Sequence, residues 1–267
     1  MPELPEVETI RLQLTQLIPG VTIKDIKILK EKSFSGDKKL LFGATITDLL
    51  RLGKMLVIKT DKKLALAVHL KMTGQLIFKS QKTSEDLPNK FTRVIISFTD
   101  GSKLYFNDVR RFGWMKIIET IEDLKKKIGP DPLKVSNSQF YKILKQTKKP
   151  VKFLLMDQEK LAGVGNIYSC ESLFLGGVNP NVSANKLTQE RSEKLLDSLK
   201  KVLNSGIKWR GASKQNFRNA YGEKGEMQEH FSVYGREGEK CLNNCGGKIM
   251  RIKMGGRSTF VCPVCQQ

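Results

Sequence analysis

The chain opens with Met1-Pro2-Glu3-Leu4-Pro5-Glu6, and apolar residues then recur at the spacing of a helix. Val7, Ile10, Leu14 and Leu17 carry this period, which predicts an amphipathic helix at the N-terminus. Proline is favoured in the first turn of a helix. One interpretation of the opening is therefore structural, with the two prolines only starting this helix.

The second interpretation of the opening is chemical. Removal of Met1 would leave Pro2 with a free secondary amine as the true N-terminus. An α-amino group titrates near pH ~8, so part of it is unprotonated and nucleophilic at neutral pH. A secondary amine can attack a sugar C1′ and form an iminium directly, with Glu3 beside it to move the protons. The stretch alone leaves both interpretations open.

Residues from Val21 to Ile118 have the pattern of short strands, because apolar or alternating runs are broken by Gly, Asp, Lys or Pro. Asp100-Gly101 is a hairpin-turn signal within this region. Roughly eight strands at short spacing predict an antiparallel sandwich. The expected strands are Thr22–Ile28, Thr45–Leu50, Met55–Thr60, Leu64–Leu70, Gln75–Lys79, Arg93–Phe98, Lys103–Phe106 and Trp114–Ile118.

The pattern changes at Gly129-Pro130-Asp131-Pro132, which interrupts regular structure twice and predicts a domain boundary. Helical periods follow, and a polar stretch from Gly211 to Gly225 then reads as a long loop, a length that is usually functional or disordered. We expect domains at 1–129, 130–231 and 232–267, and an α+β multidomain fold class. The expected helices of the second domain are Ser138–Gln146, Val151–Asp157, Ile167–Leu175 and Thr188–Asn204.

Four cysteines form two close pairs near the C-terminus. Cys241 and Cys245 are separated by three residues, sixteen residues follow, and Cys262 and Cys265 are separated by two. This pattern matches a tetrahedral structural zinc site with no open coordination position, and metal binding would supply the folding free energy of so small a unit. Disulfide or redox use is the alternative, and Cys170 reads as a small buried residue. Basic residues between the pairs make the unit a basic hairpin: Lys248, Arg251, Lys253 and Arg257.

The chain of 267 residues has a formal charge of +20. Such an excess of Lys and Arg favours a polyanionic partner, either nucleic acid or an anionic membrane face. The sequence has no apolar run of the ~18 residues that a membrane span needs, and no signal-peptide core follows its start. We therefore expect a cytoplasmic protein that binds nucleic acid and no membrane, with a merely solvated basic surface as the alternative.

Five separated motifs together resemble one family. They are the opening Pro-Glu-Leu-Pro-Glu-Val-Glu-Thr, His69–Gly74, Asp108–Gly113, the stretch from Leu155 to Tyr168 with its Gly-Val-Gly-Asn, and Val233–Arg236 before the cysteines. In order and spacing, over essentially the full length, the chain is similar to the bacterial formamidopyrimidine-DNA glycosylases, the enzymes of 8-oxoguanine repair. The related endonuclease VIII branch opens Pro-Glu-Gly-Pro-Glu, so Leu4 favours the branch that acts on oxidised purines.

The resemblance implies a bifunctional DNA glycosylase and abasic-site lyase that acts by β,δ-elimination. It assigns Pro2 as the Schiff-base nucleophile and Glu3 as the general acid and base. Lys54 would bind phosphate and assist β-elimination, although without the motif it reads as an exposed lysine at a strand edge. Arg257 would grip phosphates around the lesion and serve δ-elimination.

The same resemblance assigns DNA contacts. Met72 and Phe112 would fill the gap left by an extruded base, although in isolation both residues read as core. Arg110 would hydrogen-bond the orphaned cytosine. The remaining expected DNA-binding residues are His69, Arg93, Arg111, Lys152 and Asn166.

Two features depart from the family pattern. The first cysteine pair has three intervening residues where the family usually has two, and the loop Arg210–Met227, which covers the extruded base in the family, is only partly similar. We expect one structural Zn²⁺, a monomer, and duplex DNA with oxidised purines or abasic sites as the partner. Three alternatives remain: a family member for oxidised pyrimidines, a non-catalytic binder of damaged DNA, and an RNA-binding zinc-ribbon protein.

Overall fold

The computed structural model describes residues 1–81, 86–214 and 216–267, so Gln215 of the expected lesion-covering loop lies outside the described residues. Contacts divide the chain into two compact units. The sandwich unit comprises Met1–Lys126 and Ile207–Gln228, and the helical unit comprises Lys127–Gly206 and Glu229–Gln267. The three-domain division expected above stays a prediction.

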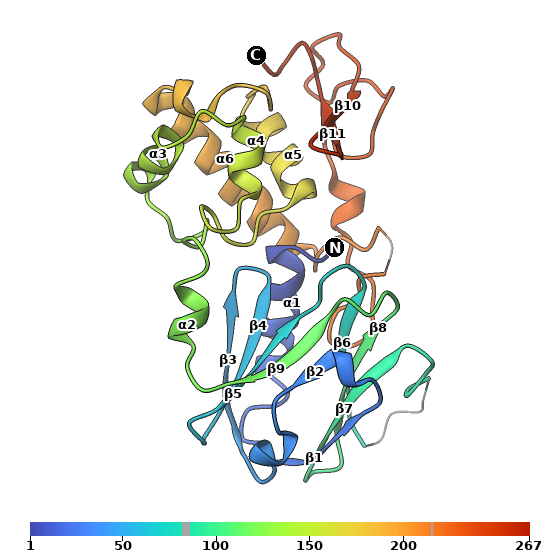
Figure 1. Ribbon diagram of the computed structural model, residues 1–267. Helices are drawn as coiled ribbons and strands as arrows, with labels where there is room; N and C mark the ends of the chain where they lie inside the picture. The colour runs from blue at the N-terminus through green and yellow to red at the C-terminus, as the bar shows by residue number, and fades with distance from the viewer. Residues whose placement is uncertain (82–85, 215) are drawn as a thin grey trace. The chain divides into compact units, whose positions relative to one another are not determined.

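The sandwich unit holds two β-sheets and the N-terminal helix α1 (Leu4–Thr15) (Figure 1). One sheet has the strand order β1-β7-β8-β6, and the other has the order β2-β9-β5-β4-β3. All strand pairs are antiparallel except β2 with β9. The strands are β1 (Ile23–Ile28), β2 (Phe34–Ser35), β3 (Ile46–Leu52), β4 (Met55–Thr60), β5 (Ala65–His69), β6 (Gly74–Lys79), β7 (Thr92–Phe98), β8 (Lys103–Asp108) and β9 (Trp114–Ile118).

The core of this unit joins both sheets to α1. Alternate residues of a strand face the same side, and one apolar face of each sheet contributes to a single buried cluster that includes Leu66 and Phe106. Helix α1 adds Val7, Ile10 and Leu14 to the same cluster, as its period predicts. The helix is therefore fixed on the sandwich by apolar packing along its length.

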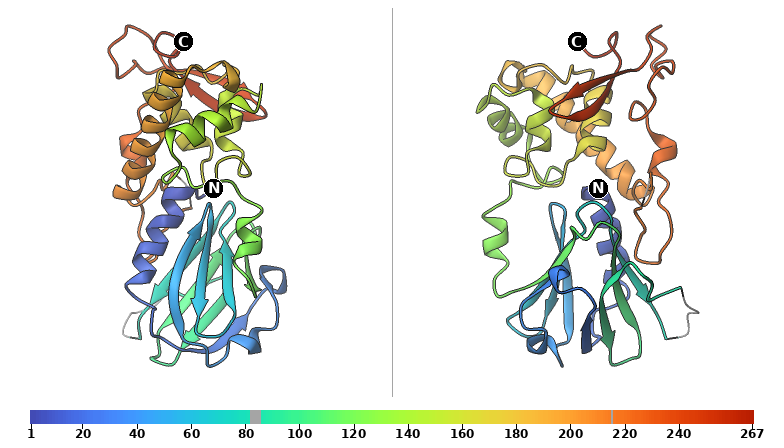
Figure 2. Two further views of the ribbon diagram at one scale, coloured as in Figure 1. Left: turned by 90° about the vertical axis from the view of Figure 1, so that its left-hand side faces the viewer. Right: turned by 45° about the vertical axis from the view of Figure 1, so that its right-hand side comes forward.

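The two sheets are connected twice at one end of the sandwich. The chain passes from β5 to β6 through residues 70–73, and it returns from β8 to β9 through residues 109–113. Pairing places the ends of these strands together, since His69 lies opposite Met55 and Trp114, and Gly74 lies opposite Asp108. The N-terminus lies at this same end of the unit (Figure 2).

The segment Ile207–Gln228 packs on the sandwich. Phe217 and Ala220 belong to its core cluster, and the backbone of Ala220 accepts a hydrogen bond from Phe78 N at 2.8 Å. Gln13 Oε1 accepts from Ala220 N at 2.9 Å, and Gln75 Nε2 donates to Asn216 O at 2.6 Å. The expected loop is therefore held to α1 and to β6 by specific hydrogen bonds.

The helical unit contains four α-helices and a two-stranded hairpin. Helix α3 begins with a capping box in which Ser136 and Gln139 satisfy each other's backbone N–H groups. Buried leucines at helical spacing line one face of α6, including Leu195, Leu199 and Leu203. The elements are α3 (Asn137–Lys145), α4 (Val151–Met156), α5 (Asn166–Leu175), α6 (Gln189–Lys208), β10 (Met250–Met254) and β11 (Arg257–Val261).

The fold class expected from the sequence is confirmed: a β-sandwich with a leading helix, a helical domain, and a C-terminal hairpin with four cysteines. The sequence pattern predicted neither the two-residue strand β2 nor the short helix α2 (Glu122–Lys125). Helix α6 extends to Lys208, beyond its expected end at Asn204. Within the described ranges, no helix combines the length and the apolar character that a bilayer crossing requires.

We predict that Gly206→Ala destabilises the helical unit, against the usual effect of this change in a helix. Alanine is normally better than glycine in a helix interior by about 1 kcal/mol. Here a Cβ at position 206 would lie 2.6 Å from the buried Tyr168 ring, and such overpacking costs about 1–3 kcal/mol. Urea denaturation should give a lower midpoint than wild type, whereas Lys201→Ala on the exposed face should not. A raised midpoint for the Gly206 variant would contradict this packing.

Candidate active site and zinc centre

The candidate nucleophile Pro2 and its neighbour Glu3 lie directly before α1, with Glu3 as the N-cap of the helix. Pro2 and Glu3 are buried, whereas Met1 is 47% exposed. The backbone N–H of Glu3 donates to Glu6 Oε2 at 2.7 Å, and the other carboxylate oxygen of Glu6 accepts from Ala212 N at 2.8 Å. Glu6 therefore connects the turn that bears Pro2 and Glu3 to the segment Ile207–Gln228.

Lys54 lies in the tight turn between β3 and β4. Gly53 makes this turn possible with a φ of 57°, and Arg51 Nη1 donates to the Gly53 carbonyl at 3.3 Å. Arg51 Nε also donates to Glu8 Oε2 of α1 at 2.7 Å. Burial pushes the pKa of Glu8 upward, but its hydrogen bonds and charge interactions with Arg11 and Arg51 outweigh this and lower the pKa. The ion pair thus fixes the Lys54 turn against α1, the helix that follows the candidate nucleophile.

His69 ends β5 beside this turn. Its Nδ1 accepts the backbone N–H of Lys71 at 3.0 Å, which leaves the proton on Nε2 when the ring is neutral. Its ring centroid lies 5.7 Å from that of Trp114. Burial, reinforced by the charges of Lys71 and Lys54, lowers the pKa of His69 to about 4. His69 is therefore a neutral Nε2–H donor at physiological pH.

The two crossing connections carry the residues expected to enter the duplex. Met72 is 42% exposed and Phe112 is 53% exposed, so the structure does not place either of them in the core. The guanidinium carbon of Arg110 lies 5.0 Å from the centroid of the Phe112 ring, a cation–π contact. These three side chains come from the connections at one end of the sandwich.

The other two expected arginines of this unit differ in exposure. Arg111 is exposed and has a φ of 60°. Arg93 is only 3% exposed, and its Nε donates to the Asp108 carbonyl at 2.8 Å. Its Nη1 donates to Lys90 O at 3.1 Å. The DNA contact expected of Arg93 stays a prediction, and in this structure its guanidinium supports the backbone of the β8–β9 connection.

In the helical unit, Asn166 starts α5 after Gly163-Val164-Gly165. Its Oδ1 accepts from Lys152 Nζ at 2.7 Å, and its Nδ2 donates to Ser258 O at 2.9 Å. Lys152 is fully buried and also donates to Thr259 Oγ1. The direct phosphate contact expected of Lys152 stays a prediction, because its ammonium group here lies inside the unit and binds Asn166.

Arg257 lies at the tip of the β10–β11 hairpin. Gly255 and Gly256 form the two-residue turn before it with φ values of 53° and 76°, as a tight hairpin turn requires. The next two residues of β11, Ser258 and Thr259, make the contacts with Asn166 and Lys152 described above. The exposed Arg257 therefore precedes two residues of β11 that are hydrogen-bonded to Asn166 and Lys152.

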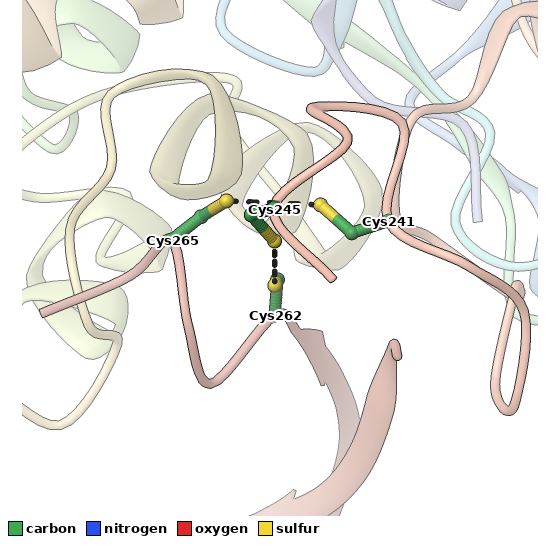
Figure 3. A group of neighbouring side chains, drawn as sticks. All are labelled: Cys241, Cys245, Cys262 and Cys265. Carbon is green, nitrogen blue, oxygen red and sulfur yellow. Dashed lines mark hydrogen bonds between the residues drawn. The ribbon is translucent and has the colours of Figure 1, made fainter. Parts of the chain in front are cut away.

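The four cysteines near the C-terminus converge (Figure 3). All four Sγ atoms lie within 4.8 Å of one another, with Cys241 and Cys265 at 3.7 Å and Cys245 and Cys262 at 3.5 Å. Disulfide bonds need sulfurs at ~2.05 Å, whereas ligands ~2.3 Å from a tetrahedral zinc lie ~3.8 Å apart. The donor set thus fits one structural Zn²⁺, and the expected site is confirmed.

The backbone between the first two cysteines adopts a turn that accommodates the unusual spacing of this pair. Asn244 adopts a φ of 53°, a left-handed conformation that asparagine tolerates better than most residues. Its N–H donates to the Cys241 carbonyl at 3.2 Å. The additional residue is therefore accommodated in a turn, and the Cys245 sulfur still lies close to the other three cysteine sulfurs.

Sequence reasoning missed three residues that organise the site. Glu6, Arg51 and Asp108 are acidic or basic side chains that bind backbone atoms of the turns described above. Glu6 and Asp108 stand within motifs quoted from the sequence, but a pattern of residues does not show which distant N–H a carboxylate accepts. The near-complete burial of Glu6 and Asp108 in the structure indicates their role.

We predict that one of the two histidines does not titrate until the pH approaches 4. The folded-state pKa of His69 lies below its ordinary value, so the unfolded chain binds a proton there that the folded chain does not. This group therefore makes stability rise between about pH 4 and pH 6.5, with no further change above. Proton NMR of the imidazole signals tests this, with His69→Gln assigning them. A midpoint near 6.5 for His69 would contradict its burial.

We predict that the four cysteines bind one zinc ion as thiolates, without forming disulfides. Removal of this ion should unfold the β10–β11 hairpin. Cys262→Ser should lose the metal, because three thiolates and a hydroxyl bind zinc far more weakly than four thiolates. Cys170→Ala, a change at the buried cysteine outside the site, should keep one zinc per chain. Elemental analysis of the purified variants provides the measurement. Equal zinc content in both variants would exclude this ligand set.

Three family models match the chain. The "Formamidopyrimidine-DNA glycosylase N-terminal domain" matches residues 1–115, the "Formamidopyrimidine-DNA glycosylase H2TH domain" matches residues 128–218, and the "Zinc finger found in FPG and IleRS" matches residues 238–267. The matched ranges contain every candidate site residue named above. The zinc-finger range includes all four cysteine ligands.

Relatives match over the full length. Formamidopyrimidine-DNA glycosylases of Desulfitobacterium hafniense and Heliobacterium modesticaldum are 37% and 38% identical, with 100% of each chain covered. A solved complex of a Lactococcus lactis FPG variant with DNA containing Fapy-dG has a TM-score of 0.90 at 36% identity, covering 100% of both chains. A complex of Lactococcus lactis Fpg with DNA containing an abasic site has a TM-score of 0.89 at 35% identity, covering 99% of both. The chain therefore belongs to the formamidopyrimidine-DNA glycosylase family.

Proposed function

We propose that this chain is a bifunctional DNA glycosylase and abasic-site lyase, which removes oxidised purines such as 8-oxoguanine and formamidopyrimidines from duplex DNA. The observation that carries the proposal is that the N-terminus, next to which Pro2 stands in the sequence, lies at the end of the sandwich where both crossing connections lie (Figure 2). Relatives over the full length bear the name of this activity, and the Lactococcus lactis protein was crystallised with DNA containing Fapy-dG or an abasic site.

The first chemical step is displacement of the damaged base. After removal of Met1, the unprotonated amine of Pro2 attacks C1′ of the deoxyribose, and the C1′–N bond to the base breaks. The departing base takes up the proton that the Pro2 nitrogen loses once it has bonded to C1′. The Glu3 carboxyl group protonates the ring oxygen as the sugar opens, and the amine nitrogen becomes an iminium. A secondary amine reaches this state without losing a further N–H proton.

The second step is strand scission. The iminium acidifies the C2′ proton, and a base removes this proton while the 3′ phosphate leaves. A further elimination expels the 5′ phosphate. Lys54 beside His69 would neutralise the phosphate nearest the reacting sugar, and Arg257 would serve the second elimination. Hydrolysis of the final iminium returns the free Pro2 amine.

Access to C1′ requires the damaged nucleotide to leave the base stack, which costs a few kcal/mol and leaves a gap. Met72 and Phe112 are exposed apolar side chains on short connections, which suits them to fill that gap. Arg110 would donate hydrogen bonds to the orphaned cytosine. Asn166 and Arg257 in the helical unit would bind phosphates, and the zinc site stabilises the hairpin that carries Arg257.

Two residues act through others in this proposal. The buried Lys152 orients Asn166 and β11, and the buried Arg93 supports the β8–β9 connection. His69 contributes a neutral donor, while Lys54, Arg111 and Arg257 contribute charge. Because contacts of cations with phosphates release counterions, binding should weaken steeply with salt. We infer that the protein acts as a monomer in the cytoplasm, where its DNA partner lies.

Borohydride reduction should trap the wild-type protein on a duplex that contains 8-oxoguanine opposite dC. One alanine inserted between Met1 and Pro2 should abolish the adduct, because the proline nitrogen then becomes an amide and is no longer nucleophilic. The trapped complex is measured as a shifted band on a denaturing gel. One alanine appended after Gln267 provides the matched control and should trap like wild type.

Intact mass must first show that Met1 is absent from the wild-type sample. Failure of such a sample to trap would refute the Schiff-base mechanism and would leave a binder of damaged DNA. Faster cleavage of a 5-hydroxycytosine·G duplex than of the 8-oxoguanine·C duplex would instead assign the chain to oxidised pyrimidines.

A further inference from the structure

Both connections at the catalytic end of the sandwich contain a residue with a strained backbone. Lys71, just before Met72, has a φ of 49°, and Arg111, between Arg110 and Phe112, has a φ of 60°. Residues with a Cβ adopt this conformation only where surrounding contacts hold them there. The turns that carry the exposed Met72 and Phe112 therefore need an anchor.

One buried carboxylate binds both connections. Asp108 has no exposed surface. Its Oδ1 accepts the hydroxyl hydrogen of Thr73, the residue after Met72, and its Oδ2 accepts the N–H of Gly113, the residue after Phe112, at 2.6 Å. The N–H of Arg110 is shared between Thr73 Oγ1 at 2.9 Å and Asp108 Oδ1 at 3.2 Å. We call Asp108, Thr73, Arg110 and Gly113 the Asp108 cluster.

Close packing and backbone hydrogen bonds around the Asp108 cluster hold its residues in one conformation. A Cβ on Gly113 would lie 2.7 Å from the Phe106 ring and 3.1 Å from Asp108 Oδ2, so the backbone approaches the carboxylate closely. The Asp108 carbonyl accepts from the buried Arg93 at 2.8 Å, and the Asp108 N–H donates to Phe91 O at 2.9 Å. Asp108 is thus fixed at its backbone and at both carboxylate oxygens.

We propose that Asp108, together with Thr73, is a positioning residue for base extrusion, which holds Met72, Arg110 and Phe112 as one preformed wedge. The inference rests on the proposed function. A wedge that is ordered before binding pays no ordering cost when the duplex is opened. Asp108 does not touch the reacting sugar in this account, so it should serve extrusion and not the chemistry of the Pro2 amine.

Asp108→Asn tests this role with almost no change in volume. An asparagine side chain has one oxygen and one NH₂ group, so in either orientation the NH₂ meets the N–H of Gly113 or of Arg110. Either the Gly113 N–H therefore loses its acceptor, or the Arg110 N–H keeps only Thr73 Oγ1. We expect the dissociation constant for a duplex with a tetrahydrofuran abasic analogue opposite dC to rise roughly tenfold or more. The preference for dC over dA opposite the analogue should fall as Arg110 loses its position.

The matched control is Asp100→Asn in the β7–β8 turn. Asp100 Oδ1 accepts from Ser102 N at 2.9 Å and from Ser102 Oγ at 2.7 Å, so the same chemical change is made in a turn at the other end of β8. This variant should bind the duplex like wild type. Thr73→Val, which keeps the shape but removes the hydroxyl, should weaken duplex binding in the same direction as Asp108→Asn.

Single-stranded DNA separates positioning from chemistry. An abasic site in a single strand has no stack to open, so borohydride trapping of Asp108→Asn on that substrate should stay within roughly twofold of wild type. Loss of this trapping in a variant with an unchanged melting temperature would overturn the proposal, because Asp108 would then serve the chemistry. Unchanged duplex binding and opposite-base preference would also overturn it. If Asp108→Asn does not fold, the same measurements on Thr73→Val test the positioning role.

If the wild-type protein forms no adduct with either substrate, the proposed function fails and not merely the role of Asp108. Trapping by wild type with unchanged behaviour of both variants would leave the function standing and refute the positioning role. The two failures are therefore distinguishable within one set of samples.

Discussion

Two of the connections between the two sheets, from β5 to β6 and from β8 to β9, lie at one end of the sandwich, and the structure depends on this constraint. Because β5 and β9 pair in one sheet while β6 and β8 pair in the other, residues 70–73 and 109–113 must lie side by side. Two short turns rigidly attached to paired strands can present side chains more precisely than one long loop. The constraint thus places Met72 and Phe112 together, although they stand forty positions apart in the sequence.

Ion pairs and hydrogen bonds of charged side chains fix the positions of the segments at this end of the sandwich. The ion pair of Glu8 with Arg51 fixes α1 to the Lys54 turn, and Glu6 joins the first turn of α1 to the segment Ile207–Gln228. Each of these groups is mostly buried and binds backbone atoms or an opposite charge. Burial of these charged groups without such partners would cost more free energy than their packing contacts contribute. The helical unit follows the same rule, since the buried Lys152 joins Asn166 to the hairpin.

Local pattern predicted much of the fold. The Asp100-Gly101 signal marks the β7–β8 turn, where Gly101 has a φ of 85°, and each of the expected strands is present. Strand β2 is two residues long and pairs with β9, so it is too short to show a period in the sequence. The polar stretch after Gly211 gave no sign that it packs on the sandwich, because its anchors, Gln13 and Gln75, lie far away in the sequence.

The candidate site was predicted by resemblance more than by pattern. The zinc ligands follow from spacing alone, whereas Met72 and Phe112 look like core residues until their exposure is known. The burial of Lys152 and the role of Asp108 depend on contacts between distant segments, which no local pattern shows.

The most direct test of the account is the position of the covalent bond in the reduced complex with damaged DNA. Peptide mapping by mass spectrometry should find the sugar remnant on the nitrogen of Pro2, in a peptide that lacks Met1. A remnant on an internal amine such as Lys54 would contradict the account.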